Sequence, residues 1–248
     1  MSEVFEPIEM VSGRFGQCHV WTDGSLAPDD AHIVLHKGER GGQKGGQGGG
    51  DGDPALTLIA RGGRGSAWRL NVNGQAAVLR QYRRGGMMAQ FNRDLYCWRG
   101  GRKTRAYREF TLMARLSEAG LAVPCPLAAM ACRVSGLFYR AAILTRFVDH
   151  VGALCAVKLP PAWYRAGQVI ARLHRAGVWH ADLNVHNILV NADNQVWLID
   201  FDRAREGVTD DTQLQANLSR LLRSVRKVCP ELEQGLWPVL LEGYKNPS

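Results

Sequence analysis

The chain has 248 residues, of which 46% are hydrophobic and 22% charged, and it carries a formal net charge of +8 at pH 7. This length and apolar content fit one large domain or two closely packed lobes, and they exclude a chain that is disordered throughout. The positive charge favours an anionic partner, such as nucleotide phosphates, nucleic acid or an acidic membrane surface, without choosing among them.

Neither a membrane span nor a signal peptide is expected. The longest apolar run, residues 121–132, falls short of the roughly 20 residues of a spanning helix and contains two prolines. The first ten residues hold three glutamates and no basic cluster before an apolar run, so we expect a cytoplasmic location. Six scattered cysteines without a Cys-x-x-Cys pair predict reduced, mostly buried thiols and no metal-ligand spacing.

The N-terminal part has little strong patterning. The apolar runs CHVW (residues 18–21) and AHIVLH (residues 31–36) predict edge strands or a loose N-terminal arm. Nine of the fifteen residues 38–52 are glycine, which predicts a flexible linker because such a segment loses much backbone entropy on ordering. A nucleotide-binding glycine loop is the alternative, but no strand pattern leads into it. We expect an N-terminal arm with this linker over residues 1–55.

Residues 56–147 have the pattern of a β-rich lobe. Three strand-like runs at residues 56–62, 66–72 and 75–82 are separated by short glycine-bearing turns, which predicts an antiparallel meander. Residues 104–120 predict an amphipathic helix that ends at Gly120. Residues 126–147 predict a hairpin that turns at Ser135 and Gly136.

Residues 148–248 predict a second, mainly helical lobe. A helical pattern runs from Pro160 to Gly177, and the short strands NILV and VWLID follow it. Two further amphipathic segments, at residues 214–225 and 232–241, complete the chain. The whole pattern predicts an α+β protein of two lobes, with a ligand in the cleft between them.

The stretch VWHADLNVHNILVNADNQVWLIDFDRAR, residues 178–205, carries the chemistry. His180, Asp182 and Asn187 form H-x-D-x4-N, and Asp200 follows at the end of an apolar strand. Mg²⁺ takes oxygen ligands, so Asn187 and Asp200 are the predicted metal ligands. Asp182 is then free to accept a proton from an attacking hydroxyl. This spacing favours phosphoryl transfer over the alternative that these residues only cap turns and end a strand.

This stretch resembles the catalytic and metal-binding loops of the protein-kinase-like superfamily, H-R-D-x4-N and D-F-G. It departs from them at Ala181, which replaces the arginine, and at Asp202, which gives DFD. The resemblance implies a two-lobed protein-kinase-like fold, with an antiparallel β-sheet and one helix in an N-lobe and a reduced, mainly helical C-lobe. Few residues follow Asp200 and there is no A-P-E, so a small or lipid-linked hydroxyl acceptor is favoured over a protein substrate. The expected N-lobe comprises residues 56–147, and the expected C-lobe comprises residues 148–248.

The resemblance extends to residues that would bind nucleotide phosphates. GGRGSAW, residues 62–68, lies where a kinase covers ATP with backbone amides, although alone it would be an ordinary hairpin turn. Kinases carry V-A-I-K where this chain has AVLR, which places a planar arginine in the position of the lysine. Glu109, on the amphipathic helix, is the expected ion-pair partner of this arginine, and the alternative for it is a solvated surface position. The predicted cofactor-binding residues are Gly63, Arg64, Gly65, Ser66, Arg80 and its ion-pair partner Glu109.

The segments RGGRGSAW, VLRQYRRGG, YRAAILTRF, HADLNVHNILV and WLIDFDRAR are similar to those of bacterial 3-deoxy-D-manno-octulosonic acid (Kdo) kinases. The resemblance spans roughly residues 60–206. It implies Mg²⁺- and ATP-dependent phosphorylation of the 4-hydroxyl of Kdo on a Kdo–lipid A precursor, by a peripheral protein at the cytoplasmic face of the inner membrane. Two alternatives stay open: a core heptose kinase or other small-molecule phosphotransferase, and a catalytically silent kinase-shaped module.

A run of basic side chains mixed with apolar and aromatic ones independently suits an anionic lipid surface. A solvated helix face is the alternative for any one of them, and no recognition motif for nucleic acid accompanies them, so we expect no nucleic-acid partner. The run comprises Arg80, Arg83, Arg84, Arg93, Arg99, Arg102, Lys103, Arg105 and Arg108.

Three histidines recur every six residues, at His174, His180 and His186. Neither helix nor loop spacing brings all three together, so a zinc site is disfavoured. We expect His180 to support the catalytic loop by hydrogen bonding.

Overall fold

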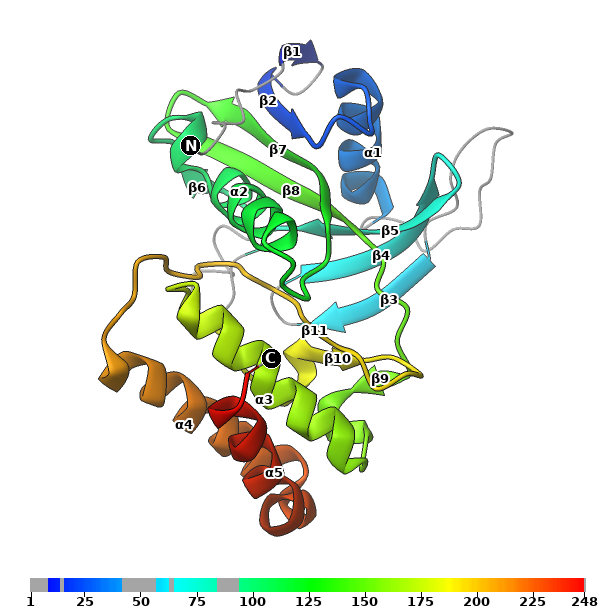
Figure 1. Ribbon diagram of the computed structural model, residues 1–248. Helices are drawn as coiled ribbons and strands as arrows, with labels where there is room; N and C mark the ends of the chain where they lie inside the picture. The colour runs from blue at the N-terminus through cyan, green and yellow to red at the C-terminus, as the bar shows by residue number, and fades with distance from the viewer. Residues whose placement is uncertain (1–8, 14–15, 42–56, 63–64, 84–93, 248) are drawn as a thin grey trace. The chain divides into compact units, whose positions relative to one another are not determined.

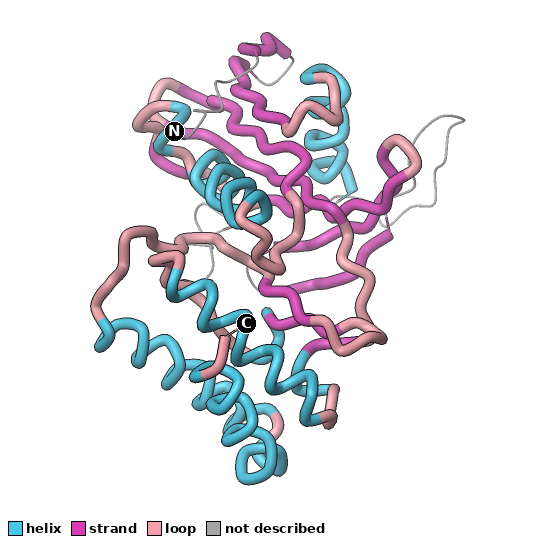
Figure 2. Tube along the Cα trace, in the orientation of Figure 1, coloured by secondary structure: helices cyan, strands magenta, loops and turns pink. Residues whose placement is uncertain are grey.

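The computed structural model describes residues 9–13, 16–41, 57–62, 65–83 and 94–247 (Figure 1, Figure 2). The chain divides into two compact units. Unit 1 comprises residues 1–114 and 125–147, and unit 2 comprises residues 115–124 and 148–248. Among the described residues, no helix combines the length and the apolar character that crossing a bilayer requires.

Unit 1 is built on an antiparallel sheet in the order β1-β2-β7-β8-β5-β4-β3, with β6 also paired to β8 (Figure 1). The predicted meander and hairpin are confirmed as β3–β5 and β7–β8. The strands are β1 (Glu9–Gly13), β2 (Gly16–Thr22), β3 (Thr57–Gly62), β4 (Gly65–Val72), β5 (Gln75–Gln81), β6 (Tyr96–Cys97), β7 (Pro126–Ser135) and β8 (Phe138–Arg146).

Helices α1 (Pro28–Gly41) and α2 (Arg105–Glu118) cover opposite faces of this sheet. Val20 of β2 shares an apolar core with Leu35 of α1. The ring of its neighbour Trp21 lies 5.2 Å from the ring of Tyr107 on α2. Successive side chains of a strand point to opposite faces, so one helix packs on each face. Helix α2 ends at Glu118, and Gly120 follows with the φ of 72° expected of a glycine just past a helix C-terminus.

The prediction of a strand or loose arm for residues 31–36 was wrong, because these residues form the middle of helix α1. Ala31, Val34 and Leu35 recur at helical spacing and are all buried. Asp29 and Asp30 lie in the first turn, where negative charge stabilises a helix N-terminus. Residues 18–21 do form a strand, but β2 lies between β1 and β7 instead of at an edge.

The prediction of six reduced thiols was wrong for Cys18 and Cys132, which form a disulfide. These residues face each other in the ladder between β2 and β7, with their Cα atoms 4.0 Å apart. They are 114 residues apart in the sequence, so local spacing gave no sign of the pairing. The free cysteines are Cys97, which is exposed, Cys125 and Cys155, which are half-buried, and Cys229, which is buried.

Unit 2 combines helices α3, α4 and α5 with a small sheet in the order β11-β10-β9 (Figure 1). The predicted helix, strand pair and two C-terminal helices are all present. The elements are β9 (Gly152–Ala153), α3 (Pro160–Arg175), β10 (Ile188–Val190), β11 (Val196–Leu198), α4 (Asp211–Val228) and α5 (Glu233–Lys245). Helices α3 and α5 meet at Gly167 and Gly243, where an added Cβ would overlap a carbonyl oxygen of the other helix.

Candidate active site

The loop of residues 177–187 joins helix α3 to strand β10 and carries the predicted base. Gly177 adopts a φ of 70° and ends the helix. Trp179 then exchanges two backbone hydrogen bonds, of 2.8 and 3.0 Å, with Arg205. At the far end, the side chain of Asn184 accepts hydrogen bonds from the N–H groups of His186 and Asn187, at 2.9 and 3.3 Å. Hydrogen bonds therefore fix the conformation of the loop near both of its ends.

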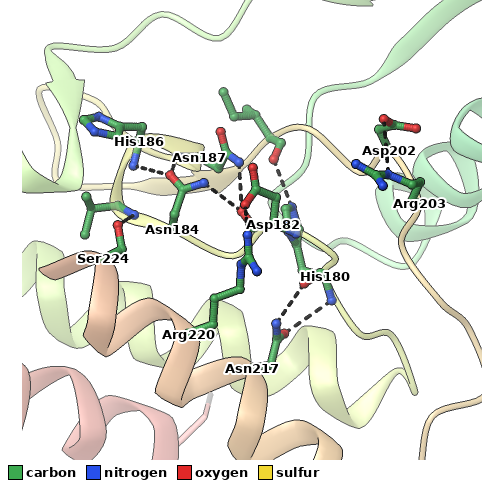
Figure 3. A network of polar contacts seen from close by, with 12 residues as sticks. His180, Asp182, Asn184, His186, Asn187, Asp202, Arg203, Asn217, Arg220 and Ser224 are labelled. Carbon is green, nitrogen blue, oxygen red and sulfur yellow. Dashed lines mark hydrogen bonds and ion pairs between the residues drawn. The ribbon is translucent and has the colours of Figure 1, made fainter. Parts of the chain in front are cut away.

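Asp182 lies at the centre of this loop (Figure 3). Its backbone carbonyl accepts hydrogen bonds from the side-chain amides of Asn184 and Asn187, each 2.9 Å long. One carboxylate oxygen forms an ion pair with the guanidinium of Arg220 on α4. The Asp182 side chain is still 29% exposed, so part of the carboxylate remains open to a hydroxyl group. Hydrogen bonds therefore fix the backbone of Asp182, while its carboxylate stays accessible.

His180 joins the loop to the end of strand β11. The N–H of Asp182 donates to His180 Nδ1 at 3.2 Å, so Nε2 carries the proton and donates to the Ile199 carbonyl at 3.0 Å. Complete burial lowers the pKa of His180 and so favours the neutral ring that this arrangement needs. The ring also packs edge-on against Phe201, with centroids 4.9 Å apart. The predicted support of the loop by hydrogen bonding is confirmed.

The hairpin of β10 and β11 brings Asn187 and Asp200 to the same end. The Ile199 N–H donates to the Asn187 carbonyl at 3.0 Å, and Asp200 is the next residue. Because the Asn187 amide nitrogen is used on Asp182, its oxygen is the atom left to act as a ligand. Asp200 adopts a φ of 65°. This left-handed conformation is unfavourable for residues other than glycine, and it recurs at functional sites. One amide oxygen and one carboxylate fit the oxygen ligands that Mg²⁺ prefers.

Three side chains of helix α4 that sequence analysis missed hold this loop in place. Asn217, Arg220 and Ser224 follow each other at spacings of three and four residues, so they share one face of the helix. Arg220 pairs with Asp182, and the Ser224 hydroxyl accepts a hydrogen bond from the Val185 N–H at 3.2 Å. The sequence signal that could have revealed these residues is the polar stripe that they form on a helix whose neighbouring leucines are buried.

Asn217 is the buried hub of the support. Its amide nitrogen donates to the His180 carbonyl at 2.8 Å, and its oxygen accepts from the His180 N–H at 3.3 Å. The same oxygen accepts from His174 Nε2 at 3.1 Å, while the Tyr244 hydroxyl donates to His174 Nδ1 at 2.8 Å. His174 and His180 thus direct both ring nitrogens to protein groups, and His186 is exposed.

The second group of predicted site residues lies in unit 1. Arg80 on β5 forms the expected ion pair with Glu109 on α2, and the Glu109 side chain is only 2% exposed. The Tyr82 hydroxyl donates to the other carboxylate oxygen at 2.5 Å, a contact that sequence analysis missed. Burial and the charge of Glu109 raise the pKa of Tyr82, so Tyr82 stays a donor. Glu109 is therefore a buried anchor for Arg80, not a solvated surface residue.

The predicted phosphate loop is only partly described. Gly62 pairs with Gly65 at the end of the β3–β4 ladder, and Gly65 and Ser66 begin strand β4. Gly63 and Arg64 lie outside the described residues.

Comparison with known proteins decides the family. A model of the lipopolysaccharide kinase (Kdo/WaaP) family matches residues 58–244. The chain belongs to this family. A 3-deoxy-D-manno-octulosonic acid kinase of Xylella fastidiosa (strain M12) is 48% identical over 174 residues, which cover 68% of this chain and 70% of that protein. The kinases of the same name from Stenotrophomonas maltophilia (strain R551-3) and Xanthomonas campestris pv. campestris (strain B100) are 47% and 46% identical, with the same two coverages.

The predicted resemblance, enzyme class and α+β kinase-like fold class are confirmed by this membership. The protein is a lipopolysaccharide kinase of the Kdo/WaaP family, and its loop departs from the protein-kinase pattern at Ala181 and Asp202. The match begins at residue 58, so strand β2 and helix α1 lie outside it.

Proposed function

We propose that this protein transfers the γ-phosphoryl group of ATP to the 4-hydroxyl of a Kdo residue on a Kdo–lipid A precursor. The loop geometry carries the proposal, because an accessible carboxylate at Asp182 is held beside the amide of Asn187. The names of the relatives support the choice of Kdo as acceptor.

Asp182 accepts the proton of the sugar hydroxyl. The hydroxyl oxygen forms a bond to the γ-phosphorus, the bond to the bridging oxygen of the β-phosphate breaks, and ADP leaves. Arg220 is a positioning residue, since its ion pair orients the carboxylate. The hydrogen bonds to the Asp182 carbonyl keep the base from rotating away with the backbone. Positioning is the main contribution that a protein makes to phosphoryl transfer.

Asn187 and Asp200 are the residues that would hold Mg²⁺. The ion, when bound, neutralises charge on the β- and γ-phosphates. The Asn187 amide is prevented from flipping by the hydrogen bond from its nitrogen to the Asp182 carbonyl. This hydrogen bond couples the proposed metal-ligating side chain to the backbone of the base, and it spans the five-residue separation between Asp182 and Asn187.

Arg80 would bind the nucleotide phosphates, and the backbone amides of residues 63–66 would cover them. Arg80 keeps 26% of its side chain exposed, while Glu109, which accepts a hydrogen bond from Tyr82, holds one edge of its guanidinium in place. An arginine offers several parallel donors to phosphate oxygens, so it can replace the usual lysine without loss of charge. The buried glutamate argues against a silent module, because a charge buried solely to orient Arg80 is costly without a ligand.

An exposed leucine and nearby basic side chains of unit 1 support peripheral contact with a membrane. Leu137, at the turn between β7 and β8, is 73% exposed. Its carbonyl accepts a hydrogen bond from the Trp98 N–H at 2.8 Å, so the turn adjoins the basic segment that follows Trp98. In that segment Arg99, Arg102 and Lys103 are all exposed. An apolar tip beside basic side chains suits an anionic lipid surface, at about 1 kcal/mol for each cation near the surface.

The acceptor is tested by offering labelled ATP and Mg²⁺ with a Kdo-bearing lipid A precursor or a heptose-bearing core. We expect transfer to the Kdo acceptor, with the phosphate mapped to the 4-hydroxyl by NMR. Transfer confined to heptose would instead support the core heptose kinase alternative. A thermal shift with Mg-ATP, absent in a silent module, checks nucleotide binding separately.

Membrane contact is tested by sedimentation with vesicles that contain anionic phospholipid. Replacing Arg102 and Lys103 together by glutamine should weaken binding by about 30-fold, from roughly 1 kcal/mol per cation. The exposed Val151→Gln variant of unit 2 serves as the control. Equal binding by the double variant and the unchanged protein would refute the lipid-facing role of this segment.

A further inference from the structure

Four side chains with metal-ligating atoms meet in unit 1, and none of them belongs to the residues assigned to catalysis, nucleotide binding or membrane contact. They are Cys18 of β2, His32 and His36 of α1, and Cys132 of β7, and their ligand atoms all lie within 4.8 Å of one another. The two cysteines face each other across the ladder between β2 and β7. The two histidines are four residues apart, so both project from the same face of the helix.

The contacts inside this cluster resemble those around a tetrahedral ion. His36 Nε2 lies 3.7 Å from the sulfur of Cys18 and 3.5 Å from that of Cys132. With Zn–S bonds of about 2.3 Å and Zn–N bonds of about 2.1 Å, tetrahedral zinc ligands of these two kinds lie about 3.6 Å apart. The rings of His32 and His36 meet edge-on, with centroids 4.4 Å apart. The nitrogen-to-sulfur distances suit a shared ion, and reduction of the disulfide would let the two sulfurs separate to the roughly 3.8 Å at which two thiolates bind one tetrahedral zinc.

Packing alone leaves part of this cluster unexplained. His32 Nε2 is buried and has no hydrogen-bond partner. A buried polar atom without a partner costs about 1–3 kcal/mol, so an imidazole directed at other ligand atoms calls for a partner of its own. Cys18 and Cys132 belong to the same apolar core as Ala31 and Leu35, whereas the two histidines are half-buried at its edge. A bound cation would satisfy the orphaned nitrogen.

We propose that the reduced chain binds one Zn²⁺ through Cys18, His32, His36 and Cys132. Two thiolates and two neutral imidazoles make a closed Cys₂His₂ set, which is typical of a structural zinc site. The disulfide and the metal use the same sulfurs, so they are two alternative states. Two electrons and two protons from a thiol reductant convert the disulfide to two thiols. Zn²⁺ then binds with release of two protons as the thiols become thiolates.

The site would fasten helix α1 to the sheet. The helix carries two ligands, and strands β2 and β7 carry one each, so the ion links three elements. Residues 42–52, which follow helix α1 in the sequence, include no apolar side chain. Three of the four ligands precede residue 58, outside the kinase family match, so the zinc site would be an addition to the kinase and not part of its chemistry.

The test uses the full chain, reduced with a phosphine, freed of metal and then titrated with Zn²⁺ against a chromophoric chelator. We expect one Zn²⁺ per chain and, with Co²⁺ as the probe, the absorption of a tetrahedral thiolate complex. Alkylation followed by peptide mass spectrometry identifies the ligands in the unmodified sequence. Zn²⁺ should slow the alkylation of Cys18 and Cys132 at least about 10-fold, and the exposed Cys97 should react as before.

Variants identify the histidine ligands. His32→Gln and His36→Gln should each weaken Zn²⁺ binding at least about 100-fold, because a four-ligand site loses a direct bond to the metal. Matched changes at the exposed sites, Cys97→Ser and His150→Gln, should leave it unchanged. A reduced chain that binds no Zn²⁺, or Zn²⁺ that protects neither Cys18 nor Cys132, would overturn the proposal. Equal losses in the matched controls would overturn it as well.

Discussion

Arg220 of helix α4 forms an ion pair with Asp182, the predicted base (Figure 3). The two residues are 38 positions apart, and the ion pair connects the catalytic loop to a helix that carries none of the predicted site residues. Asn217 and Ser224 of the same helix hold the backbone on either side of Asp182. Helix α4 is therefore the structural support of the candidate site.

Removing the Arg220 charge should lower the rate of the chemical step. We expect Arg220→Met to reduce kcat about 3- to 10-fold, since the pair is partly exposed and such pairs contribute about 1 kcal/mol. The KM for ATP should change less than kcat, because Arg220 orients the base and not the nucleotide. Steady-state kinetics beside Arg223→Met, a change at an exposed arginine one turn further on, provide the comparison. A rise in the KM for ATP with an unchanged kcat would contradict the positioning role.

The anchor of Arg80 should act on ATP binding. Glu109→Gln removes the buried charge that pairs with Arg80 and accepts from Tyr82. We expect kcat/KM for ATP to fall about 10- to 100-fold, from the 1.5–3 kcal/mol of hydrogen bonds to charged groups. Tyr82→Phe, which removes one hydrogen bond and keeps the ion pair, should have a smaller effect. Equal ATP kinetics in Glu109→Gln and the unchanged enzyme would exclude this role.

The buried hub should matter for stability. Asn217→Ala leaves the backbone N–H and carbonyl of His180 and one nitrogen of His174 without partners. We expect the free energy of unfolding to fall by about 2–4 kcal/mol, because each unsatisfied buried group costs about 1–3 kcal/mol. Urea unfolding measures this difference. Gln215→Ala at an exposed position of the same helix should change stability by less than about 0.5 kcal/mol. A matching small effect at Asn217 would show that the network carries little energy.

Acid should destabilise the folded chain below about pH 6.5. Burial lowers the pKa of His174 and of His180 from the ordinary value of 6.5. The unfolded chain therefore binds protons near pH 6.5 that the folded chain does not, so the free energy of unfolding falls as the pH drops through this value and is level above it. Urea midpoints between pH 5.5 and 7.5 test this. His174→Gln should flatten the dependence, whereas His150→Gln at an exposed site should not.

Local spacing was enough to predict the catalytic loop. H-x-D-x4-N places Asp182 and Asn187 on one short loop, and the apolar pattern of β10 and β11 predicts the hairpin that brings in Asp200. These relationships extend over about 20 residues and depend on backbone periodicity, which the sequence encodes directly. Strands β3–β5, the β7–β8 hairpin and all three helices of unit 2 were predictable for the same reason.

Contacts between distant segments were not predictable. Arg220 and Asn217 act through tertiary packing of α4, and nothing in their neighbours specifies which loop they touch. The pair Cys18 and Cys132 depends on strand order in the sheet, which brings β2 beside β7 across more than 100 intervening residues. Helix α1 was misjudged because its apolar positions are few and a short apolar run does not distinguish a strand from a helix.

The most direct measurement is the rate at which Asp182→Ala transfers labelled phosphate from ATP to a Kdo-bearing lipid A precursor. Asp193→Ala, at an exposed aspartate of the β10–β11 turn, is the matched control. Our account predicts a loss of about 10²- to 10⁴-fold in kcat for Asp182→Ala, the usual contribution of a general base, with ATP affinity preserved. Turnover equal to that of the unchanged enzyme would contradict it.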